Sequence, residues 1–444
     1  MDIKVTKFGG SSLSDAAQFR KVRAIVAADP ARRYVIPSAP GKRGKHDHKV
    51  TDLLYKCHAL AQEQRSITEV FGLVRERYLS ICTELGLTLD LNSELAEIEA
   101  QIQAGASADY TASRGEYLNG KILAAYLDFA FVDAATVIFF DAEGRFDAEK
   151  TQNVLSQELS RYPQAVIPGF YGSTPDGRIR TFSRGGSDIT GAIVARGVNA
   201  TLYENWTDVS GFLMADPRIV KNPKPIKEIT YRELRELAYM GASVLHEEAI
   251  FPVREAKIPI NIKNTNDPDA PGTLIVNDNG NLRTPGSITG IAGLKGFTII
   301  AIEKTLMHSE LGFGRKLLSV IEDHGISFEH MPSGIDTISL VIADSQLNNK
   351  LEKVLTDINR VCKPDAIEVF HDIALIATVG IGMAYTPGIA AKLFTALAEG
   401  GINVRMIDQG SSEINIIVGI ENKDFEEAMR RIYHAFVPSE TAPR

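Results

Sequence analysis

A lysine, two adjacent glycines and two serines stand together near the start of the chain, in the stretch Lys7-Phe8-Gly9-Gly10-Ser11-Ser12. Because glycine has no Cβ, this backbone can turn sharply and bring its amides close to an anion. The stretch separates a strand-like run, residues 3–6, from a helix-like run, residues 15–28, and a helix that begins here would direct its positive end toward the same anion. The pattern indicates a phosphate site with a lysine to offset charge on a transferring phosphoryl group; the alternative is a plain glycine turn.

The same combination recurs at Ser183-Arg184-Gly185-Gly186-Ser187-Asp188, beside a predicted helix at residues 187–196. An arginine can bind a carboxylate through two parallel hydrogen bonds, and the glycines allow a ligand to approach the backbone. A helix N-cap beside an exposed arginine is the simpler alternative. The recurrence of a glycine pair next to a cation and a hydroxyl favours a ligand site in both places.

Two further clusters carry groups that suit a small charged ligand. The loop that begins Ser38-Ala39-Pro40-Gly41-Lys42-Arg43 offers a hydroxyl and cations, although a solvated basic loop would have the same composition. The stretch Ser113-Arg114-Gly115-Glu116 is predicted to open a helix. In that position Glu116 either complements the helix dipole or binds a substrate ammonium.

Aspartate-rich turns follow a predicted strand at residues 200–205. They are Thr207-Asp208-Val209-Ser210-Gly211 and Asp216-Pro217-Arg218. Such residues are typical of turns, and at a strand end they also suit a nucleotide ribose or a metal associated with phosphate. The sequence contains no G-x-x-x-x-G-K-[ST] motif and no G-x-G-x-x-G that opens a helix after a strand. This excludes a P-loop and removes the main support for a dinucleotide-binding Rossmann domain.

The composition is that of a globular protein with two or three domains. The chain has 444 residues, of which 44% are hydrophobic and 23% are charged. A net charge of −8 argues against a nucleic-acid partner, and three widely spaced cysteines indicate reduced thiols instead of a disulfide framework. Because the sequence has no signal-like or membrane-spanning apolar run, we expect a cytoplasmic protein without a membrane partner.

Strand-like and helix-like runs alternate up to about residue 276, as in an α/β protein with a mainly parallel sheet. Strands are predicted at residues 33–37, 131–133, 137–140, 165–170, 200–205 and 258–263, and helices at residues 50–64 and within residues 66–103. In such sheets ligands bind at the carboxyl ends of the strands, which is where the glycine-rich turns fall. We therefore assign residues 1–285 to one catalytic domain.

After a linker rich in Asn, Asp and Gly at residues 277–285, the order β-α-β-β-α occurs twice. The first copy has predicted strands at residues 296–302, 328–331, 337–343 and 366–370 and helices at 312–324 and 346–361. The second has strands at 373–379, 404–408 and 414–420 and helices at 387–399 and 423–436. We assign residues 290–372 and 373–444 to two regulatory domains. The second copy lacks a final strand, so it is expected to take one from the first copy or from another subunit.

The motifs together closely resemble those of the aspartate kinases, a branch of the amino acid kinase family. The matching stretches are residues 7–12, 113–116, 184–188, 207–209, 216–218, 238–246 and 267–273, and the two repeats resemble the tandem ACT regulatory domains of the same family. The resemblance covers almost the whole chain. It implies an α/β fold in which a three-layer αβα kinase domain with a mainly parallel sheet precedes two α+β ACT domains of βαββαβ order.

The resemblance implies phosphoryl transfer from ATP to the β-carboxylate of L-aspartate, which gives 4-phospho-L-aspartate in the first step of lysine, threonine and methionine synthesis. A carboxylate is already deprotonated at neutral pH, so no general base is required. Mg²⁺ is expected to accompany ATP with few protein ligands, and no residue is assigned as a metal ligand. The implied roles are catalysis for Lys7 and Asp188; substrate binding for Ser38, Glu116, Arg184, Gly185 and Ser187; and ATP binding for Lys7, Gly9, Gly10, Ser11, Thr207, Asp208 and Arg218. Leu213 stands where the family usually has a tyrosine, so one nucleotide contact is not carried over.

The repeats imply feedback inhibition by an end-product amino acid, with lysine favoured over threonine. Glu329 and Asp336 would accept the ammonium groups of lysine, although acidic residues are more often plain exposed turn residues. The implied effector residues are Met307, His308, Ser309, Phe313, Ser327, Phe328, Glu329 and Asp336. Unpaired strand edges in the repeats lead us to expect a homodimer or a larger homo-oligomer.

Two alternatives remain open from the sequence. The same fold could act on a different carboxylate, such as that of glutamate. A non-catalytic amino-acid sensor would use only the repeats, but the presence of Lys7, Arg184 and Asp188 argues against it.

Overall fold

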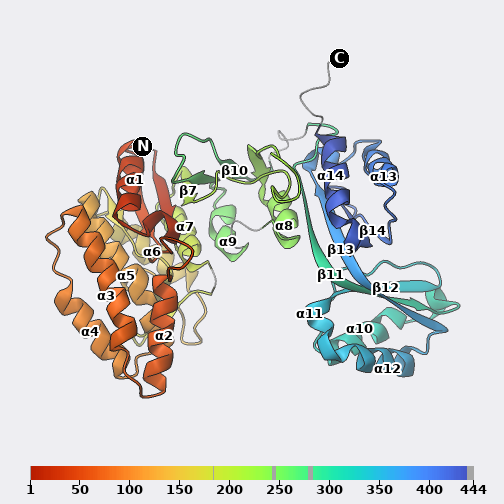
Figure 1. Cartoon of the computed structure of the whole chain (residues 1–444), viewed down its shortest axis with the longest axis horizontal. Coiled ribbons are helices and arrows are strands. Elements are labelled where there is room, and N and C mark those ends of the chain that lie inside the picture. The colour runs from red at the N-terminus through yellow and green to blue at the C-terminus, as the bar shows by residue number, and fades with distance from the viewer. Residues whose placement is uncertain (1, 184, 243–246, 279–283, 438–444) are drawn as a thin grey trace, which may run out of the picture. The chain divides into compact units, whose positions relative to one another are not determined.

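The computed structural model describes residues 2–183, 185–242, 247–278 and 284–437, and the chain divides into two compact units (Figure 1). The first unit consists of residues 1–212, 225–231 and 244–278. The second consists of residues 213–224, 232–243 and 279–444. Two segments that precede the predicted linker, 213–224 and 232–243, therefore belong to the second unit.

An eight-stranded sheet forms the centre of the first unit. Its strand order is β3-β4-β2-β1-β7-β9-β10-β8, and every neighbouring pair is parallel except β9 and β10. The strands are β1 (Lys4–Phe8), β2 (Arg32–Pro37), β3 (Ala130–Phe131), β4 (Ala165–Val166), β7 (Leu202–Thr207), β8 (Glu228–Thr230), β9 (Ile260–Asn264) and β10 (Thr273–Val276). A separate hairpin joins β5 (Tyr171–Ser173) to β6 (Ile179–Thr181). The predicted mainly parallel sheet is confirmed.

Helices cover both faces of this sheet. They are α1 (Ala16–Ala27), α2 (Val50–Gln62), α3 (Thr68–Leu85), α4 (Asn92–Gln103), α5 (Ala108–Leu127), α6 (Ala148–Leu159), α7 (Gly186–Gly197) and α9 (Glu247–Glu255). Lys7 and Phe8 are consecutive strand residues, so their side chains point to opposite faces. Phe8 belongs to the core that the sheet forms with α1 to α5, whereas Lys7 contacts α7. The three-layer arrangement thus places Lys7 on the α7 side.

Two predicted strand regions of the first unit are shorter than expected. In place of strands at residues 131–133 and 137–140 there are β3, a short 3-10 turn at Ala134–Thr136 and isolated bridges at Phe139 and Phe140. Asp133 ends the strand because its carboxylate accepts a hydrogen bond from the amide of Ala135 at 3.0 Å. The strand predicted at residues 165–170 is only β4, and Pro168 beyond it has no N–H to donate to a ladder.

The second unit contains a five-stranded antiparallel sheet in the order β12-β11-β13-β15-β14. Its strands are β11 (Gly290–Glu303), β12 (Thr337–Ala343), β13 (Ala366–Val379), β14 (Met406–Asp408) and β15 (Asn415–Glu421). Its helices are α10 (Phe313–Asp323), α11 (Asp344–Leu347), α12 (Leu351–Cys362), α13 (Ile389–Glu399) and α14 (Phe425–Phe436); α8 (Tyr231–Tyr239) lies almost wholly in this unit too. The α+β class predicted for the regulatory region is confirmed.

Strands β11 and β13 are each 14 residues long, and they pair with each other along almost their whole length. The first half of β11, from Gly290 to Lys295, pairs with residues 374–379 of β13, and the second half, from Phe297 to Glu303, pairs with residues 366–373. The strands predicted separately at 366–370 and 373–379 are therefore one strand. The predicted domain boundary at residues 372 and 373 falls inside it.

The prediction of a strand at residues 328–331 was wrong. Only isolated bridges, His330 to Val341 and Ser333 to Ile338, link this segment to β12. Pro332 between them has no N–H, which interrupts the ladder. Two separate cores hold the unit together: one lies between β11, β12, α10 and α12, and the other joins β13, β15, α13 and α14 to Ala215 and Val220 of the segment 213–224.

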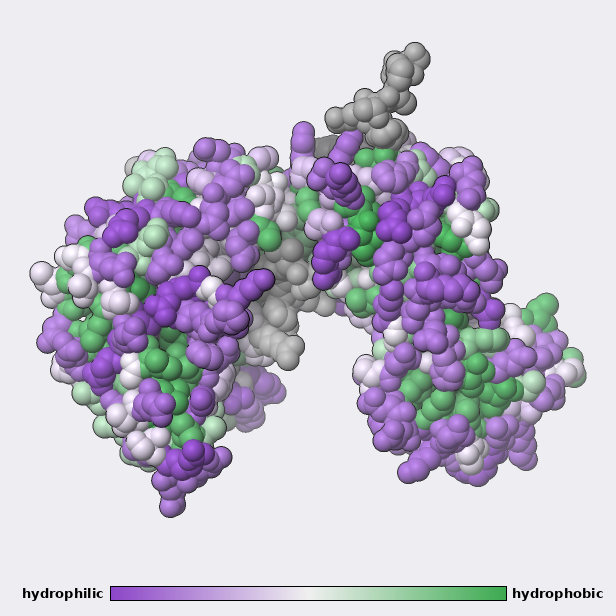
Figure 2. Space-filling model, in the orientation of Figure 1, coloured by the Kyte–Doolittle hydropathy of each residue, from purple (hydrophilic) through white to green (hydrophobic). Residues whose placement is uncertain are grey.

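Figure 2 shows that the visible surface of each unit is dominated by hydrophilic residues, with hydrophobic side chains in small groups. Among the helices of the described residues, none has the length and apolar character needed to cross a membrane.

Candidate active site

Lys7 and Asp188 form the centre of the candidate site. Lys7 lies on β1, between β2 and β7, and its Nζ is 2.5 Å from Oδ1 of Asp188 in the first turn of α7. Both side chains are largely buried, with 10% and 14% of their surfaces exposed. A lysine that a carboxylate holds in one direction suits the stabilisation of charge on a phosphoryl group, because the cation is in place before the charge develops.

Asn205 completes this group, although sequence reasoning missed it. It lies opposite Lys7 on the neighbouring parallel strand β7, and its Nδ2 donates to the same Oδ1 of Asp188 at 2.8 Å. The residue is 4% exposed. The hydroxyl of Tyr203, two residues earlier on β7, donates to the backbone carbonyl of Asp188 at 3.2 Å. The only signal for Asn205 is the register of β7 against β1, which requires the fold.

Glycines at both turns are required by close packing. A Cβ on Gly10 would lie 2.8 Å from the carbonyl oxygen of Ala39, and a Cβ on Gly186 would lie 2.5 Å from the ring of Phe170. Gly185 has a φ of 75°, in the left-handed region that favours glycine. The amide of Gly9 donates to the carbonyl of Trp206 at 2.9 Å, so this amide is engaged within the sheet.

Glu116 does not open a helix, contrary to the prediction. Helix α5 begins at Ala108, where the side chain of Ser107 accepts a hydrogen bond from the amide of Tyr110 at 3.1 Å, and Glu116 lies in its middle. Glycine is required at position 115 of the helix because a Cβ there would lie only 2.9 Å from the Cβ of Ala39. Of the two roles considered for Glu116, complementing the dipole at a helix start is therefore ruled out.

Glu116 is a buried carboxyl group whose hydrogen-bonding capacity is only partly used. The residue is 5% exposed; Oε1 accepts a hydrogen bond from the amide of Ala39 at 3.1 Å, and Oε2 is buried without a partner among the described residues. Burial raises the pKa of Glu116 to about 7, although the Ala39 amide and the charges of Lys7 and Arg114 oppose this shift. Such a group suits a ligand ammonium, which would supply both a donor and a counter-charge.

One cavity of about 550 Å³ brings most of the predicted substrate residues together. It is lined by the predicted substrate residues Ser38, Glu116, Gly185 and Ser187 and by the predicted catalytic residues Lys7 and Asp188. Arg184, the predicted carboxylate ligand, lies outside the described residues. The cavity has the volume of a small-molecule site and combines a cation, a buried carboxyl group and hydroxyls.

Four residues that line the cavity were not predicted: Thr51, Tyr55, Phe170 and Phe182. Thr51 and Tyr55 are four residues apart on α2 and therefore share a face, a spacing that could have been noticed. Phe170 has a φ of 82°, which is a rare conformation for an aromatic residue and has no sequence signal. Its amide donates to Oγ1 of Thr190 at 3.0 Å, which helps to hold this conformation.

The predicted ATP residues Gly9, Gly10, Ser11, Thr207 and Asp208 lie at one edge of the sheet. Strands β1 and β7 are parallel neighbours that end at Phe8 and Thr207, so the turns that follow them adjoin. The hydroxyl of Thr207 donates to Oδ1 of Asp208 at 3.3 Å.

Arg218 is not among the residues that the first unit assembles. It belongs to the second unit, where its Nη2 is 2.6 Å from Oδ2 of Asp216. Its side chain is 88% exposed.

The carboxylates near these turns are possible ligands of the Mg²⁺ that accompanies ATP. Among residues 2–183, 185–242, 247–278 and 284–437, no group of three or more His, Cys, Asp or Glu side chains could hold a metal ion. Asp188 and Asp208 follow the carboxyl ends of strands and carry the oxygen ligands that Mg²⁺ prefers. The contacts of Asp188 with Lys7 and Asn205 both use Oδ1. These donors fit an ion that is held mainly by nucleotide phosphates.

The predicted effector residues of the second unit fall into two environments. Met307 and Phe313 are 8% and 3% exposed and belong to the core under α10 and α12. His308 and Ser309 share a 3-10 turn and contact each other, Nε2 to Oγ at 3.0 Å. Oδ1 of Asp336 accepts a hydrogen bond from the amide of Leu306 at 2.8 Å. Asp336 therefore fixes the turn that carries His308 and Ser309.

The other effector residues, Ser327, Phe328 and Glu329, follow α10 and lie nearer the surface. Ser327 and Phe328 are exposed. The carboxylate of Glu329 accepts a hydrogen bond from the hydroxyl of Tyr239, at the end of α8. The next residue, His330, contacts Asp408 of β14, Nδ1 to Oδ2 at 2.5 Å. This short segment thus joins two other elements of the second unit.

Comparisons with known proteins agree with this architecture. The amino acid kinase family model matches residues 2–264, and an ACT domain model matches residues 376–436. Aspartokinase 3 of Bacillus subtilis (strain 168) is 41% identical over 450 residues, with 98% of each chain covered.

Solved structures of aspartate kinases are similar over the full length. The Clostridium acetobutylicum enzyme is 57% identical with a TM-score of 0.93, covering 99% of this chain and 100% of that one. Escherichia coli aspartokinase III in complex with lysine and aspartate is 26% identical with a TM-score of 0.75 and the same coverage. The family match over more than half of the chain and the full-length relatives agree, and the chain belongs to the aspartokinases of the amino acid kinase family.

Proposed function

We propose that the chain transfers the γ-phosphoryl group of ATP to the β-carboxylate of L-aspartate. The observation that carries the proposal is the contact between Lys7 and Asp188 in a cavity that Glu116 also lines, in a chain whose full-length relatives are aspartokinases. A carboxylate oxygen forms a bond to the γ-phosphorus while the bond from that phosphorus to the bridging oxygen breaks. The products are 4-phospho-L-aspartate and ADP.

Each end of aspartate has a counterpart in this proposal. The ammonium would bind Glu116, whose Oε2 is buried and unpartnered among the described residues. The α-carboxylate would bind Arg184, and the hydroxyls of Ser38 and Ser187 would contact the substrate in the cavity. A structure of Escherichia coli aspartokinase III contains aspartate and ADP, which supports the same pair of ligands here.

Lys7 would neutralise charge on the transferring group. Asp188 would hold the lysine in place and would itself be held by Asn205. The turns after β1 and β7 would receive the phosphates and the ribose of ATP. Bound Mg²⁺ would supply further charge neutralisation across the phosphates, with Asp188 or Asp208 as its protein ligand. Because the acceptor is a carboxylate, the residues need only align it and exclude water.

Hydroxylamine traps acyl phosphates, which gives a direct test. The purified chain incubated with ATP, Mg²⁺, L-aspartate and hydroxylamine should form aspartyl hydroxamate. Absence of hydroxamate at every effector concentration would refute the proposal. Replacing L-aspartate by L-glutamate tests the alternative acceptor, and a calorimetric titration that detects amino-acid binding but no ATP binding would favour the sensor alternative.

Feedback inhibition by lysine is the second part of the proposal, with threonine as the competing effector. It is supported by the structure of Escherichia coli aspartokinase III with lysine and by the carboxylates of Glu329 and Asp336 in the second unit. Kinase assays with lysine, threonine or both decide between the two. This regulation would fit an enzyme at the start of lysine, threonine and methionine synthesis.

A homodimer or larger homo-oligomer is the third part. Residues 366–372 of β13 pair with β11 on one side only, among the described strands, so a second copy could extend the sheet there. Light scattering at several protein concentrations measures the subunit number. The cytoplasmic location and the lack of nucleic-acid and membrane partners stay predictions.

A further inference from the structure

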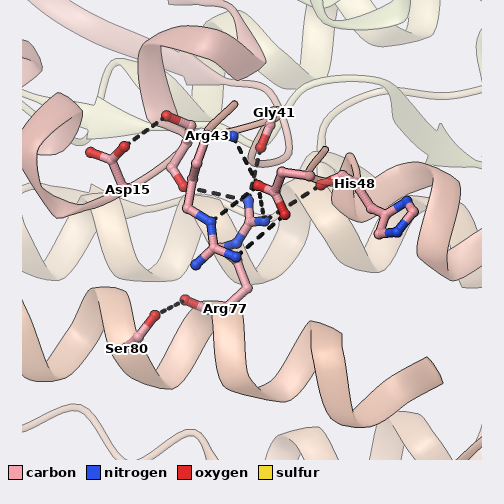
Figure 3. Close-up of polar contacts among 8 residues, drawn as sticks. Asp15, Gly41, Arg43, His48, Arg77 and Ser80 are labelled. Carbon is pink, nitrogen blue, oxygen red and sulfur yellow. Dashed lines mark hydrogen bonds and ion pairs between the residues drawn. The ribbon is translucent and has the colours of Figure 1, made fainter. Parts of the chain in front are cut away.

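Arg77 is a buried arginine of the first unit that joins two turns of the chain (Figure 3). It lies on α3 and is 3% exposed. Its Nη1 donates to the carbonyl of Gly41 at 2.8 Å and to that of Ser14 at 3.5 Å. Its Nη2 donates to Oδ2 of Asp47 at 2.5 Å and to the carbonyl of His48 at 3.4 Å. One guanidinium therefore holds the turn that follows β1 and both ends of the loop at residues 41–48.

These two turns are in direct backbone contact. The amide of Gly41 donates to the carbonyl of Gly10 at 2.8 Å. A Cβ on Gly41 would lie 2.6 Å from the carbonyl carbon of Gly10, so no other residue fits there without movement. Any shift of the loop would therefore move Gly10, in the glycine turn to which we assign the phosphates of ATP.

Asp47 makes the attachment of Arg77 to the loop an ion pair. Its carboxylate also accepts hydrogen bonds from the amide of Arg43 at 2.8 Å and from Nε of Arg43 at 3.1 Å (Figure 3). Burial alone would raise the pKa of Asp47, but the hydrogen bonds from Arg43 and the charge of Arg77 outweigh it and hold the pKa well below its usual range. Asp47 is therefore ionised at neutral pH and forms an ion pair with Arg77.

The residues that lead into this loop, Ser38 and Ala39, are held by a different helix. Nδ2 of Asn119 donates to the carbonyl of Ser38 at 2.6 Å, and the amide of Ala39 donates to Glu116 at 3.1 Å. Both partners are on α5. The part of the loop that lines the substrate cavity is thus positioned by α5, and the part that touches Gly10 is positioned by Arg77 of α3.

We propose that Arg77 is a positioning residue for nucleotide binding, because it holds the loop at residues 41–48 against Gly10 and so fixes the shape of the glycine turn. The inference rests on the proposed function and adds to it a residue that touches neither substrate. It predicts that loss of Arg77 weakens the binding of ATP more than that of aspartate. Ser38 and Ala39, on the aspartate side, keep their own contacts with α5.

The test compares Arg77→Met with Arg75→Met in the full chain. Arg75 lies on the same helix and pairs with Glu99 at 2.7 Å, so its loss removes an ion pair without disturbing the loop. Because a hydrogen bond to a charged group is lost, Arg77→Met should raise the KM for ATP by about tenfold or more, with a smaller change in the KM for aspartate. Arg77→Lys keeps the charge but loses the fork of donors, so it should restore part of the affinity. Arg75→Met should leave both KM values unchanged.

Two further measurements do not depend on turnover. Calorimetry with Mg²⁺ and ADP should show weaker binding to Arg77→Met, and trypsin should cut faster after Lys42, Arg43 or Lys45 in the released loop. Asp47→Asn weakens the same attachment while keeping the shape of the side chain, and it serves as the deciding variant if Arg77→Met does not fold. Asp47→Asn should also raise the KM for ATP selectively.

The outcomes separate this inference from the proposed function. If the unaltered chain binds no ADP, the proposed nucleotide site fails. If the unaltered chain binds ADP and the folded Arg77 and Asp47 variants bind it equally well, or if both KM values rise together, only the role of Arg77 is overturned.

Discussion

Lys7 and Asn205 lie opposite each other on neighbouring parallel strands, and both contact the same oxygen, Oδ1 of Asp188, at 2.5 and 2.8 Å. The register of β1 against β7 therefore fixes where the two donors stand, and the first turn of α7 supplies the acceptor. A cation, an amide and a carboxylate from three elements meet at one atom. Their geometry depends on the sheet and the helix together. Substitution of Lys7 or Asn205 tests the contribution of each donor separately.

Lys7→Met should abolish turnover while the chain still folds. Removing a positioned cation from the transferring phosphoryl group is expected to lower kcat on the order of a thousandfold. The hydroxamate assay measures the loss, and thermal unfolding reports whether the fold persists. The matched control is Lys4→Met, because Lys4 lies on the same strand and pairs with Asp29 at 2.7 Å at a more exposed position. Activity retained in Lys7→Met would remove Lys7 from its proposed role.

Substitutions of Asn205 should separate orientation from charge. Asn205→Leu removes one of the two donors to Asp188, and the loss of one hydrogen bond to a charged group corresponds to a decrease in kcat of about tenfold. Asn205→Asp also adds a like charge beside the buried carboxylate, so it should decrease kcat further. Steady-state kinetics of both variants give the ranking. Activity equal to that of the unaltered chain in both variants would show that Asp188 needs no second donor.

Glu116 should make aspartate binding depend on pH. Its pKa of about 7 means that the carboxyl is protonated in a growing fraction of molecules below neutrality, so the KM for aspartate should fall as the pH rises through about 7. Glu116→Gln should raise this KM and remove the trend, and the KM for ATP in the same assays is an internal control. A KM for aspartate that stays constant between pH 6 and 8, with this pKa present, would contradict the assignment to the ammonium.

The same group links protonation to stability. Because the pKa of Glu116 rises from 4.5 to about 7 on folding, the folded chain binds this proton more tightly than the unfolded chain does. The free energy of unfolding should therefore decrease as the pH rises from about 4.5 to about 7, and this contribution should level off above that range. Glu116→Gln should lack this part of the pH dependence in denaturant titrations.

The hydrogen bond from Tyr239 to Glu329 should oppose the effector. An ammonium that binds Glu329 must displace the hydroxyl of Tyr239, so Tyr239→Phe should lower the lysine concentration needed for half inhibition. Glu329→Gln should raise it. Glu352→Gln, on the exposed side of α12, is the control and should change nothing. A higher half-inhibiting concentration in Tyr239→Phe, or a lower one in Glu329→Gln, would contradict the placement of lysine at Glu329.

The sequence predicts the sheet and the turns of the site because local chemistry determines them. The glycine pair beside Lys7 marks a turn at the carboxyl end of β1, where ligands bind to parallel sheets, whereas the pair beside Asp188 follows β6 of the separate hairpin. Asn205 and Phe170 could not be found in this way. The first depends on strand register, and the second has a left-handed backbone that its residue type does not favour.

The errors in the sequence prediction also have local causes. The helix start predicted at Ser113 was wrong: α5 begins at Ala108 and continues through Ser113 and Gly115, although both residue types have low helix propensity. His371 and Asp372 resemble a turn, and Asp372 does adopt a φ of 59°. Strand β13 nevertheless continues through them because β11 pairs with it on both sides of this point.

The double pairing of β11 has a consequence for synthesis of the chain on the ribosome. Residues 290–295 leave the ribosome at the start of the first repeat, yet their partners at residues 374–379 follow that repeat. Until those partners emerge, β11 offers an unpaired edge, and such edges associate with other chains. Emergence of residues 374–379 of β13 is therefore the step that pairs this edge and protects the nascent protein from aggregation.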